Sequence, residues 1–348
     1  MLPLLLLLFA GPSTPAAPVP WRQDRFVISA WVDPIVPPSR YDAEYARMRA
    51  ANFSMLLGGF GAKSRADVVL QVAAAARAGM AAVPSYCGGA CINVSGAWGL
   101  QISDEPSAKA FAALAPKVAQ VKAAGKLAFV NLLPNYASSP GQTGVASYED
   151  YVARFVAEVK PNLLSTDHYP DFREPVVDQR KQAYVDNMLI LRAASLKASI
   201  NWWNFFSAMP FNKEAMFDIS ESQLRWQIYT SLAIGSKGVL YFCYWTPDGG
   251  DFLRGQAIMT PDCSTVKPGE KCDISDQVPS RKYPIVQRIN AKLSVLGGFL
   301  LERASSAVLQ AAGNRTHSVA IENHRNLTSI NVRAPDNDIQ HGMPYIHT

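Results

Sequence analysis

Residues 26–60 read FVISAWVDPIVPPSRYDAEYARMRAANFSMLLGGF, and this stretch decides how the chain folds. A short run rich in β-branched and aromatic residues, 26–32, is followed by a segment of helical period, 41–51, and then by a second apolar run, 55–60. A strand, a helix and a second strand in this order are typical of the βα units that build a parallel sheet. The stretch therefore predicts an α/β fold.

The same alternation continues along most of the chain. We expect eight strands, at Phe26–Val32, Met55–Phe60, Ala81–Tyr86, Gly99–Asp104, Leu127–Leu133, Leu163–His168, Ile200–Phe206 and Val239–Trp245. We expect helices at Tyr41–Ala51, Ala66–Ala78, Ser107–Ala124, Tyr148–Val159, Gln182–Leu196, Ser222–Ile234 and Ile285–Leu296. Eight strands with following helices over about 270 residues predict a (β/α)8 TIM barrel. We place this barrel at residues 22–300.

Two parts of the chain depart from the pattern. Only eleven residues, Cys87 to Ala97, lie between Tyr86 and Trp98, whereas a parallel crossover usually needs about a dozen residues or more and a helix. The third helix is therefore expected to be absent or replaced by a tight loop, unless a strand is wrongly assigned. Residues 304–348 predict a short β-rich tail, an incomplete β domain, with strands at Ser305–Gln310, His317–Glu322 and Thr328–Val332.

The first residues indicate export. Met1–Ala10 reads MLPLLLLLFA, a run of about ten apolar residues that fits a cleaved signal peptide better than a membrane span of about 20 residues. We assign residues 1–17 to this leader, although no Lys or Arg precedes the run, and no later stretch predicts a membrane span. Sequons for N-glycosylation begin at Asn52, Asn93, Asn314 and Asn326. We expect a glycoprotein that is secreted or enters a lysosome-like compartment.

The cysteines fit the same compartment. Five are too few for a disulfide scaffold, and no pair of CxxC motifs has the spacing of a zinc module. In an oxidising environment the pairs Cys87/Cys91 and Cys263/Cys272 could each close a small disulfide loop. Cys243 would then be a buried free thiol inside an apolar run. The alternative is that all five cysteines are reduced.

The composition excludes several classes of protein. Of the 348 residues, 49% are hydrophobic and 18% are charged, so the chain is too apolar to be disordered. The net charge of +5 is spread along the chain without a block of like charges, so nucleic acid is not an expected partner. No GxGxxG or GxxxxGKS/T motif is present, and His168 is the only histidine before the tail. We therefore expect no cofactor, no metal site and no Ser-His-Asp triad; no oligomeric state is indicated.

The reactive side chains of a barrel lie at the carboxyl ends of its strands and in the loops that follow them. In the expected strands, this rule selects carboxylates and aromatic rings. The acids are Asp33, Asp104, Glu105, Asp167, Asp248 and Asp251. The aromatic residues near the same rim or in the barrel wall are Trp31, Trp98, Tyr136, Tyr169, Trp202, Trp203 and Trp245.

Carboxylates beside aromatic rings suit the hydrolysis of a glycosidic bond. One carboxylic acid protonates the leaving oxygen, and a second carboxylate attacks the anomeric carbon or activates water. Two adjacent acids such as Asp104 and Glu105 raise one pKa of the pair, which a general acid needs near neutral pH. If both lie in a strand, alternation lets only one of them face the substrate.

Residues 98–106, WGLQISDEP, resemble the strand-four Asn-Glu-Pro signature of the (β/α)8 glycoside hydrolases of the β-galactosidase/cellulase clan. Residues 166–170, TDHYP, are similar to the strand-six His-x-Tyr region of that clan. Tyr244-Trp245 resembles the tryptophan that closes its strand eight under the sugar. The resemblance covers roughly residues 25–300, and it implies that Glu105 is the acid/base of a glycosidase.

Two positions differ from the pattern of the clan. Asp104 stands where the clan has asparagine, and residues 200–206, INWWNFF, contain no counterpart of its strand-seven glutamate nucleophile. Asp167 is therefore the better second carboxylate, an arrangement that resembles barrel glycosidases pairing strands four and six. The doublet of Asp104 and Glu105 also resembles the pair of substrate-assisted hexosaminidases, in which the aspartate orients the acetamide of the substrate.

We therefore predict a secreted glycoside hydrolase acting on an oligo- or polysaccharide. The expected catalytic residues are Glu105, Asp167 and Asp104. The expected carbohydrate-binding residues are Trp31, Asp33, Asn135, Tyr136, His168, Tyr169, Trp202 and Trp245. A carboxyl separation of about 5–5.5 Å between Glu105 and Asp167 would indicate a retaining pair, and about 6.5–9.5 Å an inverting pair. The alternatives are a catalytically inactive carbohydrate-binding barrel and a truncated chain that folds poorly.

Overall fold

The computed structural model describes residues 18–62, 64–171, 177–210, 216, 218–247, 257–262, 264, 273, 275–305, 308–310, 318–320, 329–331 and 345–347. Eight parallel strands overlap the eight expected ranges: β1 (Val27–Ala30), β2 (Met55–Leu57), β3 (Ala81–Val83), β4 (Gly99–Asp104), β5 (Leu127–Asn131), β6 (Leu164–Asp167), β7 (Trp202–Ser207) and β8 (Gly238–Phe242). An α/β fold with parallel strands is therefore confirmed.

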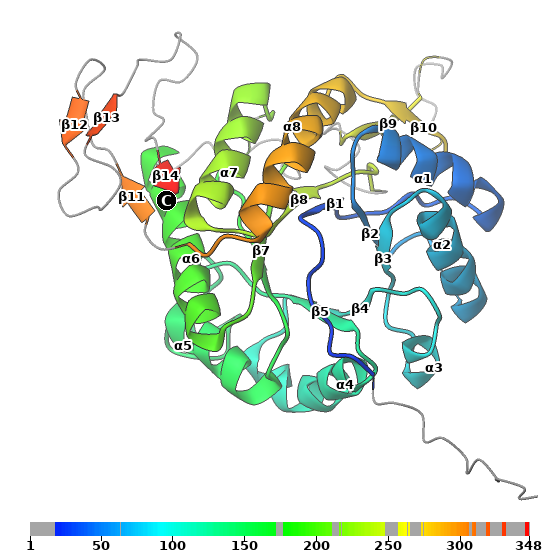
Figure 1. The fold of residues 1–348 in the computed structure, drawn as a ribbon, viewed down its shortest axis with the longest axis horizontal. Coiled ribbons are helices and arrows are strands. Elements are labelled where there is room, and N and C mark those ends of the chain that lie inside the picture. Colours follow the sequence, from blue (N-terminus) through cyan, green and yellow to red (C-terminus); the bar gives the residue numbers. More distant parts are fainter. Residues whose placement is uncertain are drawn as a thin grey trace, which may run out of the picture.

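Helices follow the strands and lie on their outer side (Figure 1). They are α1 (Tyr41–Ala50), α2 (Arg65–Arg77), α3 (Gly89–Ile92), α4 (Phe111–Ala123), α5 (Tyr148–Arg154), α6 (Val177–Ala198), α7 (Glu221–Ile234) and α8 (Tyr283–Leu301). Short 3-10 turns precede α1 and α4 at Pro38–Arg40 and Ala108–Ala110, and a π-helical turn, Phe155–Val159, continues α5. A small hairpin of β9 (Met259–Pro261) and β10 (Gln277–Pro279) precedes α8.

Every strand from β1 to β8 has parallel neighbours. Four of them pair in the order β1-β8-β7-β6, and two further pairs are β2-β3 and β4-β5. Single bridges link these sheets, between Ser85 and Gln101 and between Leu132 and Thr166. The amide of Ser54, just before β2, donates a hydrogen bond of 2.9 Å to the carbonyl oxygen of Ile28 in β1, so β1 and β2 are also joined. All carboxyl ends of the strands therefore face one edge, where the acids of β4 and β6 can meet.

Two apolar clusters lie on opposite sides of the strands. Trp203 and Phe205 of β7 belong to the inner cluster, whereas Trp202 and Phe206 pack with the helices in the outer one. This alternation follows from the two-residue period of a strand. A Cβ at Gly238 would lie 2.6 Å from Cδ1 of Trp203, so the neighbouring strand needs glycine beside this large ring.

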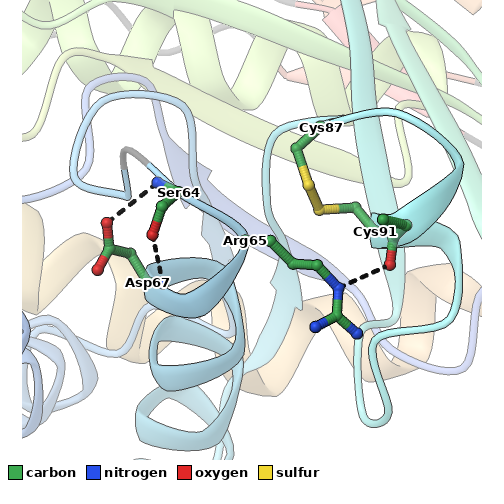
Figure 2. Close-up of a disulfide and its surroundings, with 6 residues drawn as sticks. Ser64, Arg65, Asp67, Cys87 and Cys91 are labelled. Atoms are coloured by element: carbon green, nitrogen blue, oxygen red, sulfur yellow. Dashed lines mark hydrogen bonds between the residues drawn. A yellow bond between two sulfur atoms is a disulfide. The ribbon is translucent and has the colours of Figure 1, made fainter.

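Local sequence signals explain where several helices begin and end. The Ser64 hydroxyl accepts from the amide of Asp67, whose carboxylate accepts from the amide of Ser64 in return (Figure 2). Ser220 and Gln223 form the same capping box at the start of α7. Gly235 ends α7 with φ of 102°, a left-handed conformation that a side chain would disfavour.

The connection between β3 and β4 is short. The four-residue helix α3 takes the place of a full crossover helix, and a disulfide joins Cys87 to Cys91 around it (Figure 2). The Nε atom of Arg65 donates a hydrogen bond of 3.1 Å to the carbonyl oxygen of Ala90, which ties α2 to this loop. Cys243 is a buried free thiol, as expected. Cys263 and Cys272 lie outside the described residues.

The described part of the tail consists of short antiparallel pairs. β11 (Val308–Gln310) pairs with β14 (Tyr345–His347), and β12 (Ser318–Ala320) pairs with β13 (Ser329–Asn331). The leader at residues 1–17 lies outside the described residues. In the part of the chain that the structure describes, no helix is both long enough and apolar enough to cross a bilayer.

Candidate active site

A cavity of about 330 Å³ opens at the carboxyl ends of the strands. Its lining combines acids and amides with aromatic rings from β1, β4, β5, β6, β7 and β8 or from the residues that follow them. The lining residues are Trp31, Asp104, Glu105, Asn131, Tyr136, Gln142, Asp167, Tyr169, Phe205 and Phe242. Six of these ten were expected from the sequence, namely Trp31, Asp104, Glu105, Tyr136, Asp167 and Tyr169.

The cavity brings together all three expected catalytic acids. Asp104 ends β4, Glu105 follows it, and Asp167 ends β6. Strand alternation would let only one of Asp104 and Glu105 face the substrate if both lay in the strand, but β4 ends at Asp104 and both residues line the cavity. Glu105 has a left-handed backbone with φ of 45°, so it leaves the strand geometry and its side chain reaches the cavity beside that of Asp104.

Two hydrogen bonds hold this unusual backbone. The amide of Glu105 donates to the carbonyl oxygen of Asn131 at 2.9 Å. The hydroxyl group of buried Tyr151, on α5, donates to the carbonyl oxygen of Pro106 at 2.5 Å. A left-handed non-glycine residue costs on the order of 1–3 kcal/mol and persists only where its surroundings over-determine it. β5 and α5 supply that support on either side of Glu105.

The side chain of Asn131 joins two of the acids. Its Nδ2 donates to Oδ1 of Asp167 at 2.9 Å and to Oδ1 of Asp104 at 3.2 Å. Its Oδ1 accepts from the hydroxyl group of Ser165 at 2.9 Å. Asn131 is the last residue of β5 and is only 3% exposed. The strand-end rule that selected Asp104 and Asp167 would also have selected it.

The electrostatics of the site favour protonated acids. Burial and then the charges of Glu105 and Asp104 raise the pKa of Asp167 well above its ordinary value. Burial and the charge of Asp104 raise the pKa of Glu105, while a hydrogen bond with Asp167 opposes this rise. Burial also raises the pKa of Asp104, and the hydrogen bond from Asn131 lowers it.

The side chains of Glu105 and Asp167 are hydrogen-bonded to each other. The two carboxyl groups are therefore in contact beside the ends of β4 and β6. Two carboxyl groups in contact titrate as a pair and keep a shared proton to a higher pH than either would alone. One carboxyl group of such a pair can hold a proton while the other is charged.

Aromatic rings form much of the remaining wall. Trp31 contacts Phe205 edge-on, with ring centroids 5.8 Å apart, and Tyr169 packs on Phe242 at 5.2 Å. Tyr136 is 46% exposed at the rim and contacts the ring of His168 edge-on at 4.8 Å. His168 is itself 2% exposed and does not line the cavity, so it lies behind Tyr136.

Asp33 has a structural role instead of the expected contact with sugar. Its side chain is fully buried and accepts from the amides of Gly59, Phe60 and Gly61 and from Nε2 of Gln71. These four bonds fix the loop between β2 and α2. Burial raises the pKa of Asp33 to about 6 against the opposing effect of the amides.

Three further expected sugar contacts lie elsewhere. Trp245 is fully buried in the outer cluster, because β8 ends at Phe242 and strand alternation stops before it. Trp202 begins β7 at the opposite end of the strand and lines a separate cavity of about 360 Å³. Asn135 is bound to α6, with its Nδ2 donating to the carbonyl oxygen of Ala183 at 2.9 Å.

Four residues of the lining were not expected. Asn131 and Phe205 are strand residues near the carboxyl ends, and Phe242 ends β8, so strand position could have indicated them. Gln142 comes from the long loop after β5, and no sequence signal marks it. The expected Asp248 and Asp251 lie outside the described residues.

Solved structures with a similar fold include several glycoside hydrolases. The β-galactosidase from the psychrophilic Marinomonas ef1 matches with a TM-score of 0.54 and 11% identity, over 79% of this chain and 62% of that chain. An endo-β-1,4-mannanase from Thermotoga petrophila matches with a TM-score of 0.51 and 10% identity, over 78% and 77% of the two chains. The hyperthermostable endo-1,4-β-D-mannanase from Thermotoga petrophila RKU-1 matches with a TM-score of 0.50 and 8% identity, over 77% of this chain and 99% of that chain.

These similarities concern the fold alone. No protein-family model matches the chain, and a comparison with curated proteins finds no match. The chain thus has an α/β fold with a parallel sheet, like that of TIM-barrel glycoside hydrolases. Because one fold supports many activities, the function has to be argued from the cavity and its acids.

Proposed function

We propose that this protein is a secreted glycoside hydrolase whose eight strands close into a (β/α)8 barrel. It would cleave O-glycosidic bonds of an oligo- or polysaccharide without a cofactor. The observation that carries the proposal is the meeting of Asp104, Glu105 and Asp167 in one cavity with aromatic walls. Glycoside hydrolysis requires two carboxyl groups in one cavity, and aromatic rings beside them offer flat apolar surfaces to the sugar.

Glu105 acts in this proposal as the general acid. Its pKa is raised by burial and by Asp104, so it holds a proton that can be delivered to the leaving oxygen. Asp167 supplies the second carboxylate, as nucleophile or as base for water, and Asp104 orients the substrate. A sugar entering the cavity has to separate Glu105 from Asp167, which leaves the proton on one carboxyl group and the charge on the other.

The proposal includes export of the protein from the cell. The leader at residues 1–17, a disulfide between Cys87 and Cys91, and the absence of a membrane-crossing helix among the described residues are all consistent with a secreted protein. Disulfides persist in oxidising compartments, where polysaccharide substrates are also found.

The test is product release from a panel of aryl glycosides and oligosaccharides by the wild type, Glu105→Gln and Glu149→Gln. Glu149 lies exposed on α5 and gives the same chemical change away from the cavity. We expect Glu105→Gln to lower turnover about 100- to 10,000-fold, the usual value of a general acid. Equal turnover in Glu105→Gln and the wild type, or sugar binding without any product from the wild type, would overturn the proposal.

A further inference from the structure

Asn131 occupies a central place among the three acids although it is not an acid itself. Its side-chain amide contacts Asp104 and Asp167, and its main-chain oxygen accepts from the amide of Glu105. It therefore has a hydrogen bond to each of these three acidic residues. A single residue of β5 thus links the end of β4 to the end of β6.

The direction of the Asn131 amide is fixed by Ser165. The Ser165 hydroxyl is fully buried and donates to Oδ1 of Asn131, which leaves the two N–H bonds of Nδ2 for the aspartates. The reverse orientation would place Oδ1 against two carboxylate oxygens. Since a buried acceptor facing other acceptors is costly, the observed orientation is strongly preferred.

We propose that Asn131 is a positioning residue that holds Asp104 and Asp167 in place and sets the pH range in which the three acids exchange protons. Each N–H bond it donates stabilises the ionised form of an aspartate. It therefore limits how many protons the cluster keeps and allows one member to stay charged while another holds a proton. The inference extends the proposed function and rests on it for the link to catalysis.

Asn131 lowers the pKa of both aspartates, and Tyr169 adds a second side-chain hydrogen bond that lowers the pKa of Asp167. The titratable side chains that face the acids are Tyr148 and Tyr151 on α5, Tyr169 after β6 and Tyr136 after β5, with His168 behind Tyr136. A tyrosine is neutral at the pH of most hydrolases. No lysine or arginine is among the described residues that line the cavity.

Asn162 provides a matched control at the other end of β5. Its Oδ1 accepts from the amide of Ala128 at 3.2 Å, and its Nδ2 donates to the carbonyl oxygen of Lys126 at 3.0 Å. It thus joins neighbouring segments in the same way as Asn131 but contacts no acid. Replacing it removes a partly buried asparagine that does not line the cavity.

The experiment compares Asn131→Ala, Asn131→Asp, Ser165→Ala and Asn162→Ala with the wild type. One measurement is the pH profile of kcat/KM, and the other is a carboxyl-carbon NMR titration of the ligand-free protein. In Asn131→Ala we expect the acid limb, the low-pH side of the kcat/KM profile, to move to higher pH by about one unit. Each N–H donor that is removed raises the pKa of the carboxyl group it served by about one unit. Below that limb, kcat/KM falls about tenfold relative to the wild type.

The other three variants are expected to shift the acid limb by different amounts. Asn131→Asp replaces two donors by a fourth carboxylate, so its limb should move further than that of Asn131→Ala. Ser165→Ala frees the amide to rotate and should shift the limb in the same direction by a smaller amount. Asn162→Ala should keep the wild-type profile while lowering the melting temperature.

Two results would overturn the inference. One is an unchanged acid limb and unchanged carboxyl titration in Asn131→Ala, even if stability or kcat falls, because this would reduce Asn131 to a structural role. The other is an equal shift in Asn162→Ala. If the wild type cleaves no glycoside, the proposed function fails, but the carboxyl titration still decides whether Asn131 controls the protons of the cluster.

Discussion

The hydroxyl group of Tyr151 donates a hydrogen bond of 2.5 Å to the carbonyl oxygen of Pro106, one residue beyond Glu105. Through this bond, α5 holds the turn that gives Glu105 its left-handed backbone. The acid is therefore placed by a helix that contributes no side chain to the lining of the cavity.

We predict that Tyr151→Phe lowers kcat about tenfold and changes KM little, because the Glu105 backbone loses one of its two supports. The lost hydrogen bond should also lower the free energy of unfolding by about 1–2 kcal/mol. Tyr241→Phe is the matched control, since the Tyr241 hydroxyl donates at 2.7 Å to Asn290, and its side chain lies in the outer cluster. A tenfold loss of kcat in Tyr241→Phe would show that stability alone explains the effect.

The exposed rim residue Tyr136 should contribute to substrate affinity. We expect Tyr136→Ala to raise KM about fivefold, a loss of about 1 kcal/mol of ring contact with the sugar, and to leave the melting temperature unchanged. Phe299→Ala removes a ring that is 62% exposed on α8, far along the chain from the cavity residues. The prediction is wrong if KM is the same in Tyr136→Ala as in Phe299→Ala.

Asp171 should make stability depend on pH. Burial raises its pKa from 3.8 to about 7, against the charges of Lys181 and Lys282. Between these two values the folded state holds a proton that the unfolded state has released, so the free energy of unfolding falls as pH rises through this window. Three pKa units correspond to about 4 kcal/mol, an upper bound for this single group.

Asp171→Asn should remove that dependence. It is expected to be more stable than the wild type at pH 8, where burial of the aspartate charge costs most, and about equally stable at pH 4. Urea unfolding at the two pH values measures the difference. If Asp171→Asn is destabilised equally at pH 4 and pH 8, the carboxylate of Asp171 is not the source of the pH dependence of stability.

The disulfide between Cys87 and Cys91 should make a modest contribution to stability. It closes a loop of only a few residues, so loop-closure entropy gives about 2 kcal/mol, which the double substitution of both cysteines by serine should remove. Activity at 25 °C should stay within about twofold, since the disulfide lies outside the cavity lining. Loss of activity in the folded double variant would contradict this view of the third unit.

The order of strands and helices could be predicted from the sequence because it depends on local apolar runs and their periods. The positions of Asp104 and Asp167 followed from the same reasoning, since each ends a strand. Glu105 was selected by the same rule, but the direction of its side chain could not be predicted, because its left-handed φ is held by Asn131 and Tyr151, which are distant in the chain. Here tertiary contacts override strand alternation.

The residues expected to contact sugar also show that tertiary contacts limit prediction from the sequence. Asp33 follows β1 as a ligand-binding acid would, but three amides of the next loop surround its carboxylate. Trp245 was placed by extending β8 beyond Phe242, where the strand ends. Position after a strand thus selects candidates, and only the neighbouring loops decide whether such a side chain binds a ligand or holds the backbone.

All three acids and the asparagine that joins them lie within one continuous segment, residues 104–167. The described lining from β7 and β8 is apolar, consisting of Phe205 and Phe242. The acids of the cavity are thus encoded together, apart from this apolar part of its wall. Mutations at Phe205 and Phe242 can therefore reshape this part of the wall while every acid of the cavity is kept.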